Sequence, residues 1–81
     1  MATRRQNESK FPHWIDLPDQ GRLYWRDVRS RSGKIVRYIK IVDVAETTRE
    51  FRQEVYDARG ELIEIHEKFP IDRGHQRVKK E

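Results

Sequence analysis

The sequence predicts an all-β (β-rich) fold, a four-stranded antiparallel meander of two hairpins. Residues 34–44 are rich in β-branched and aromatic side chains, which favour strands. Residues 30–33 (Ser-Arg-Ser-Gly) and 57–60 (Asp-Ala-Arg-Gly) each end on a glycine, as hairpin loops with a left-handed last residue do. Residues 50–69 alternate apolar and polar side chains around the second loop, which is typical of a half-buried hairpin.

The two ends of the chain are predicted to lie outside a single small domain at residues 11–71. Residues 1–10 are polar and charged with no periodicity, which indicates a disordered basic tail. Residues 11–18 hold two prolines and alternating large apolar side chains, so we expect an extended lid over one apolar face. Residues 72–81 begin with a turn at 72–75 and are predicted to form a basic C-terminal tail.

The first hairpin joins a strand at 22–30 to a strand at 34–44. A three-residue loop pairs Ser30 with Lys34, and this register sets the remaining cross-strand pairs. The pairs are Val28 with Val36, Asp27 with Arg37, Trp25 with Ile39, and Leu23 with Ile41. Asp27 and Arg37 are therefore expected to form an ion pair across the two strands.

The second hairpin is predicted to pair Asp57 with Glu61 across its loop. The expected partners are then Tyr56 with Leu62, Val55 with Ile63, Gln53 with Ile65, and Arg52 with His66. One face of this hairpin collects Phe51, Val55, Ile63, Ile65 and Phe69, and the other collects Arg52, Glu54, Glu64 and His66.

Residues 47–59 also fit a helix, which gives an α+β fold as the alternative. Residues 47–50 (Thr-Thr-Arg-Glu) match a capping box, and Gly60 would end the helix. Apolar residues at helical spacing support it: Val44, Phe51 and Val55, with Thr48. The threonines and the paired loop signatures favour the strands.

Charge is distributed unevenly along the chain. The totals are 18 Lys or Arg, 14 Asp or Glu, and a net charge of +4. Residues 22–42 hold seven cations against one acid, whereas residues 43–69 hold four cations against eight acids. The sequence has no cysteine, no apolar run of membrane length and no apolar segment in residues 1–10. We therefore expect a soluble, cytoplasmic protein without disulfides or cysteine-based sites.

Nucleic-acid binding is the function that this charge pattern favours. Five side chains are predicted to share one face of the first hairpin: Arg22, Tyr24, Arg26, Tyr38 and Lys40. Cations interleaved with aromatic rings suit phosphate contact and base stacking on RNA or DNA. Basic residues of the two tails would add phosphate contacts: Arg4, Arg5, Arg77, Lys79 and Lys80. The competing interpretation is a solvated face whose charge the acidic half of the chain neutralises.

A protein-interaction module or homodimer is the alternative function. The central strands are apolar on both sides, and so short a chain covers only one face of a sheet well. The face opposite Tyr24 and Tyr38 is predicted to hold five apolar side chains: Leu23, Trp25, Ile35, Ile39 and Ile41.

A small metal-independent ribonuclease is the third interpretation. His66, His75 and Arg52 are the candidates for proton transfer and phosphate stabilisation, although the chain has no nucleophile motif. The histidines lie far apart in sequence, so neither a metal site nor another cofactor is expected. A small basic β-rich chain with a Gly74-His75 turn resembles the ribonuclease toxins of bacterial toxin–antitoxin pairs. That resemblance implies ribonuclease activity and assigns no residue a role.

Overall fold

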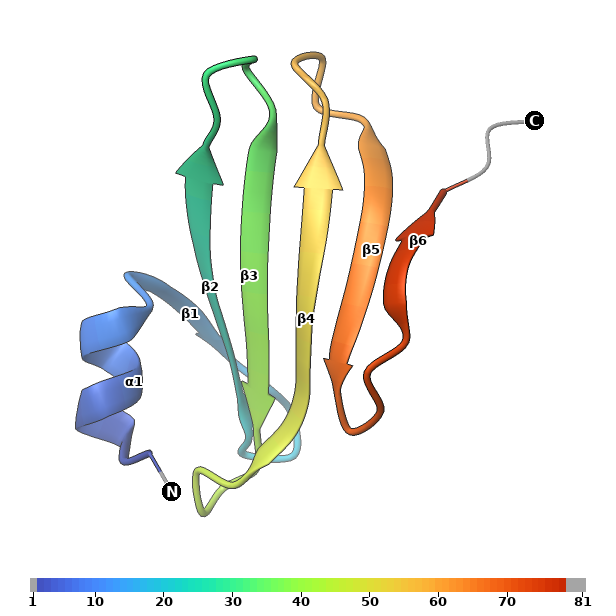
Figure 1. Ribbon diagram of the computed structural model, residues 1–81. Helices are drawn as coiled ribbons and strands as arrows, with labels where there is room; N and C mark the ends of the chain where they lie inside the picture. The colour runs from blue at the N-terminus through green and yellow to red at the C-terminus, as the bar shows by residue number, and fades with distance from the viewer. Residues whose placement is uncertain (1, 79–81) are drawn as a thin grey trace.

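The structure, a computed structural model, describes residues 2–78 and contains one antiparallel sheet of six strands in chain order (Figure 1). The elements are α1 (Arg4–Lys10), β1 (His13–Asp16), β2 (Arg22–Arg29), β3 (Ile35–Val42), β4 (Thr48–Tyr56), β5 (Leu62–Phe69) and β6 (Gly74–Arg77). The all-β class is confirmed, with six strands in place of the predicted four and one short helix. No helix of the described chain is long and apolar enough to cross a membrane.

The register of the first hairpin is confirmed. Val28 pairs with Val36 and Asp27 pairs with Arg37, whose Nε lies 2.8 Å from the Asp27 Oδ1. Gly33 closes the loop with a φ of 84°, a left-handed conformation that glycine adopts without steric cost.

Four loops of the sheet share one backbone design. In each, the first residue donates its N–H to the carbonyl of the fifth, and the fourth donates to the carbonyl of the first. The loops are Leu17–Gly21, Ser30–Lys34, Asp43–Thr47 and Asp57–Glu61. The fourth position has positive φ in all of them and is Gln20, Gly33, Glu46 or Gly60. The sequence therefore signals this design only in the two loops that place glycine there.

The predictions of two tails and a lid are wrong, because these segments form a helix and two further strands. Residues 4–10 form α1 instead of a disordered tail, and Thr3 begins the helix with a capping box to Gln6. β1 replaces the lid, since the tight loop after it returns the chain to pair His13 with Trp25 at the sheet edge. β6 occupies part of the predicted C-terminal tail, whereas Lys79 and Lys80 lie outside the described residues.

The second hairpin forms as strands, so residues 47–59 do not form a helix. Its predicted register holds at Asp57 with Glu61 and at Tyr56 with Leu62, and it is wrong beyond these two pairs. Tyr56 faces Leu62 as expected, and then a bulge on β5 places Glu64 opposite Val55. One extra residue moves the following side chains to the other face of the sheet. His66 therefore faces Gln53 rather than Arg52.

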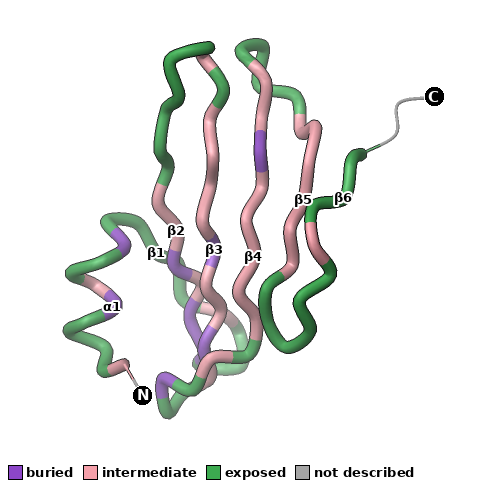
Figure 2. The backbone as a smooth tube through the Cα atoms, viewed as in Figure 1, coloured by how far each residue is buried: buried purple, intermediate pink, exposed green. Residues whose placement is uncertain are grey.

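The two faces of the sheet differ in what covers them. We call the face that α1 contacts the helix face and the other the far face. The core lies on the helix face beside α1, where Phe11, Tyr24 and Val42 are buried and Tyr38 and Phe51 pack against them. Figure 2 shows the buried segments gathered mainly near α1, while most of the sheet is only half-buried. A large part of both faces is thus open to solvent.

Candidate functional site

Glu46 fastens α1 to the sheet. Its carboxylate is buried and accepts hydrogen bonds from Asn7 Nδ2 (2.8 Å), the Tyr24 hydroxyl (3.0 Å) and Arg4 Nε (3.2 Å). Burial acts to raise the pKa of Glu46, but these three donors hold that pKa below its ordinary value. The charged carboxylate therefore joins the helix, β2 and the β3–β4 loop at one point.

Three of the five predicted nucleic-acid contacts are engaged within the fold, and two of them, Arg22 and Tyr24, are buried. The strand register does place Arg22, Tyr24, Arg26, Tyr38 and Lys40 on one face. Tyr24, however, is 0% exposed beneath α1, so no base can stack on it. Lys40 donates its Nζ to Asn7 Oδ1 at 2.8 Å, and burial lowers the pKa of its ammonium.

Arg22 is also occupied within the fold. Its side chain is largely buried and forms ion pairs with Asp16 (2.7 Å) and Glu8 (2.8 Å). Arg22, Tyr24 and Lys40 thus hold α1 and β1 in place. Part of the basic and aromatic pattern that predicts nucleic-acid binding therefore serves the polar contact between α1 and the sheet.

Arg26 and Tyr38 remain on the open part of the helix face, and Lys68 joins them. The Arg26 guanidinium lies 5.2 Å from the centroid of the Tyr38 ring, and Lys68 Nζ lies 5.7 Å from the same centroid. Within residues 2–78, neither cation forms an ion pair with a carboxylate. Two positive charges therefore flank one half-buried aromatic ring with no carboxylate of the described chain in ion-pair contact, and Asp72 acts on Lys68 from a longer distance.

These residues belong to a straight line of side chains across five strands, which we call the cross-strand row. Its members, from β2 to β6, are Arg26, Tyr38, Gln53, His66 and His75. Each pairs directly with the next, so all five side chains lie on the helix face. At the usual strand spacing the row is about 19 Å long.

The row ends on two histidines in contact with each other. Their ring centroids are 4.3 Å apart, and each ring is held by its own carboxylate. His66 Nε2 lies 2.7 Å from Asp72 Oδ1, and His75 Nδ1 lies 2.5 Å from Glu64 Oε1. A charged carboxylate only accepts hydrogen bonds, so each of these ring nitrogens carries a proton.

Asp72 is well suited to hold His66. It accepts the backbone N–H of Gly74 at 2.9 Å, and this hydrogen bond, followed by the one from His66, lowers the pKa of Asp72. The other nitrogen of His66, Nδ1, is buried and has no hydrogen-bond partner among the described residues. An unsatisfied buried acceptor typically costs about 1–3 kcal/mol, and folded proteins tolerate few of them outside functional sites.

The structure brings together two of the three predicted catalytic candidates and separates the third. Arg52 lies on the far face, where it forms ion pairs with Glu50 and Glu54. The bulge on β5 decides this outcome, because it turns His66 toward the helix face. No sequence signal marks that bulge. Within residues 2–78, no group of three His, Asp or Glu side chains is arranged to hold a metal ion.

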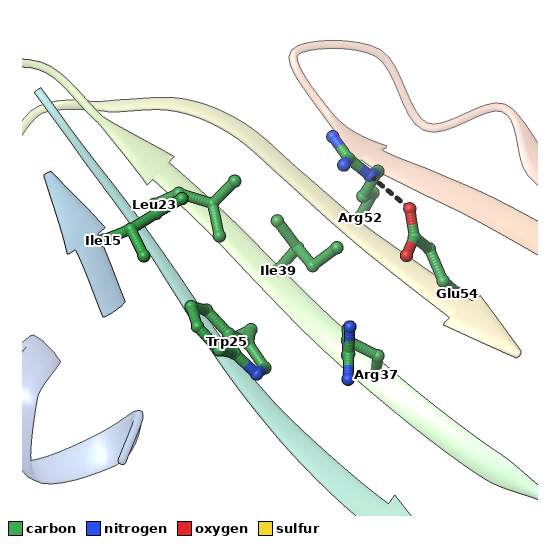
Figure 3. Close-up of a pocket in the computed structure, with 7 residues that line it drawn as sticks. All are labelled: Ile15, Leu23, Trp25, Arg37, Ile39, Arg52 and Glu54. Carbon is green, nitrogen blue, oxygen red and sulfur yellow. Dashed lines mark hydrogen bonds and ion pairs between the residues drawn. The ribbon is translucent and has the colours of Figure 1, made fainter. Parts of the chain in front are cut away.

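The far face carries a shallow hollow of about 310 Å³ (Figure 3). Its lining residues are Ile15, Leu23, Trp25, Arg37, Ile39, Arg52 and Glu54. Apolar side chains of β1, β2 and β3 form one side, and charged side chains of β3 and β4 form the other. Of the five apolar residues predicted for this face, Ile39 is buried, and Leu23, Trp25, Ile35 and Ile41 are half-buried.

The candidate site therefore has two ends: the basic–aromatic cluster of Arg26, Tyr38 and Lys68 at one end of the cross-strand row, and a pair of carboxylate-held histidines at the other. Comparison of the chain with protein-family models, with curated proteins and with solved structures finds no significant match.

Proposed function

We propose that the protein binds single-stranded nucleic acid along the cross-strand row. The observation that carries this proposal is the pair of cations, Arg26 and Lys68, that flank Tyr38 while neither forms an ion pair with a carboxylate of residues 2–78. Phosphate groups supply the missing negative charge, and an aromatic ring on an open sheet offers a stacking surface for a base. Most other arginines of the described chain already have carboxylate partners.

The shape of the row favours a single strand over a duplex. The row is a line on an open, twisted sheet and projects no helix or ribbon that would enter a groove. Sheets that bind single strands stack unpaired bases on aromatic residues of adjacent strands. Gln53, in the middle of the row, adds an amide that can both donate to and accept from a base edge.

Replacing Tyr38 with alanine is expected to weaken binding about tenfold, because stacking of one base contributes on the order of 1–3 kcal/mol. Replacing Arg26 with glutamate is expected to weaken binding more and to flatten its dependence on salt by about one phosphate contact. Fluorescence anisotropy of a labelled single-stranded oligonucleotide, measured over a series of salt concentrations, gives both quantities.

Arg29→Glu is the matched control for Arg26→Glu. Arg29 lies on the same strand, carries the same charge and faces the other side of the sheet. Its replacement changes the net charge equally and should reduce affinity much less. Equal losses in the two variants would mean that net charge alone drives binding, and the cross-strand row would then not be the site.

Self-association through the far face is a second candidate function, and the hollow favours it. A two-fold pair of copies would cover Ile15, Leu23 and Trp25, and the hollow presents both signs of charge, which can oppose each other across a two-fold axis. We expect a dimer mass in sedimentation and a monomer for Ile15→Lys, since Ile15 is 51% exposed at the edge of the hollow. Ile71→Lys, which changes a residue that is also exposed (60%) but lies outside the hollow, should leave the dimer intact. A monomer for the unmodified chain at high concentration would exclude this function.

A further inference from the structure

His75 presents a free, oriented ring nitrogen at the end of the cross-strand row. Its Nδ1 donates to Glu64, so in the neutral ring Nε2 carries the lone pair. The side chain is 54% exposed, and its contact with Glu64 uses Nδ1 and leaves Nε2 outside that contact. A histidine held at one nitrogen by a carboxylate and open at the other is arranged to accept a proton from a ligand.

The surroundings of His75 fix this ring in place. The ring of His66 lies against it, with centroids 4.3 Å apart, and Asp72 in turn holds His66. The side chain of His66 is only 14% exposed, so it packs against His75 and is not itself accessible to a ligand. His66, Asp72 and Glu64 are therefore positioning residues around one exposed imidazole.

We infer that the protein cleaves single-stranded RNA, with His75 as the catalytic residue. The inference rests on the proposed function, because the cross-strand row must hold the strand whose phosphate reaches His75. RNA is the substrate class that fits, since its 2′-hydroxyl is an internal nucleophile beside each phosphate. A single proton acceptor then suffices to start the reaction.

The step balances without a further reactant. The 2′-oxygen attacks the adjacent phosphorus, and its proton passes to Nε2 of His75. The bond between phosphorus and the 5′-oxygen breaks, and that oxygen receives the proton from the imidazolium through a water molecule. The products are a 2′,3′-cyclic phosphate and a 5′-hydroxyl end, and His75 is neutral again. Glu64 stabilises the imidazolium between the two transfers.

The test is cleavage of a short end-labelled RNA by the full chain, beside DNA of the same sequence. The RNA should yield ends with a cyclic phosphate and a free 5′-hydroxyl, and the DNA should remain intact. His75→Ala, purified in the same way and measured at saturating RNA, should lose at least about a hundredfold in rate. Because His75 is exposed, imidazole added to the solution should restore part of the lost activity.

The positioning of His75 by Glu64 is tested separately, through the kcat and KM of a Glu64 variant. Glu64→Gln keeps the size and the hydrogen bond but removes the charge that stabilises the imidazolium. It should therefore lower kcat with little change in KM, a separation that general loss of structure would not produce.

The outcomes distinguish the two proposals. Binding along the row without cleavage would overturn this inference and leave the proposed function standing. Absence of both binding and cleavage would remove both. Cleavage that persists in His75→Ala, or cleavage of DNA at the same rate, would assign the activity to something other than His75 and the 2′-hydroxyl, and would also overturn the inference.

Discussion

Replacing Glu46 with glycine is expected to lower the free energy of unfolding by about 3 kcal/mol, although the change relieves backbone strain. Glu46 has a φ of 63°, in the left-handed region that costs a residue with a side chain about 1 kcal/mol or more. Against that gain, the change removes the acceptor shared by Asn7 and Tyr24, which are fully buried. It also detaches α1 from the β3–β4 loop. Denaturant titration measures the difference.

Gln20→Gly is the matched control, because Gln20 occupies the same position in a loop of the same design. Its φ is 66°, and it is exposed. This variant should be neutral or more stable by up to about 1 kcal/mol, since it loses strain and no buried contact. If Glu46→Gly and Gln20→Gly behaved alike, the carboxylate of Glu46 would have no structural role.

The same carboxylate predicts a dependence of stability on pH. The pKa of Glu46 is lower in the folded protein than its ordinary value of 4.5, so its contribution is complete above that value. It is lost as the pH falls through the lower folded pKa, where the carboxylate takes up a proton. Glu46→Gln should therefore differ most from the unmodified chain at neutral pH, and the difference should shrink in acid. A constant difference at all pH values would contradict the charged role.

Replacing Gly21 with alanine is expected to destabilise the protein by about 3 kcal/mol for a purely steric reason. A Cβ at this position would lie 2.5 Å from the backbone oxygen of Val42 and 2.9 Å from Asp19 Oδ1. The carbonyl of Val42 belongs to β3 and cannot move without separating β2 from β3. Thermal unfolding followed by circular dichroism would show the loss as a lower Tm.

Gly60→Ala separates this clash from the general effect of changing a loop glycine. Gly60 has a φ of 84° but nothing within 4 Å of an added Cβ, so only the left-handed conformation opposes alanine there. Its replacement should cost about 1 kcal/mol. A cost at Gly21 no larger than that at Gly60 would mean that β2 and β3 separate easily at this end.

The first hairpin could be predicted in full from sequence because its determinants are local. One register of β2 against β3 follows from the glycine at the left-handed loop position and from the apolar alternation on both sides of the loop. The Asp27–Arg37 ion pair agrees with that register. The loops at Gln20 and Glu46 have the same backbone but carry side chains at that position. Glycine is the usual signal there, so neither of these two loops, nor the strand β1 that the first one pairs, can be recognised from the sequence.

The candidate site was only partly predictable, because it depends on contacts between segments far apart in the chain. The strand register places the five basic and aromatic side chains on one face as expected, yet nothing in residues 1–10 indicates that Asn7 shares the Glu46 carboxylate with Tyr24 and binds Lys40. Likewise, the meeting of His66 with His75 required both a bulge on β5 and a sixth strand. Bulges depend on the packing of a whole sheet, and four-residue strands leave little pattern to recognise.

A sheet with so little covering has a consequence for how the protein responds to temperature. Among the described residues only five apolar side chains are buried: Phe11, Tyr24, Ile39, Val42 and Val55. Unfolding therefore exposes little new apolar surface, and the heat-capacity change should fall below the roughly 12–15 cal/mol/K per residue that is usual. The stability curve is then shallow, and the chain should lose its fold gradually over a wide range of temperature while resisting cold denaturation.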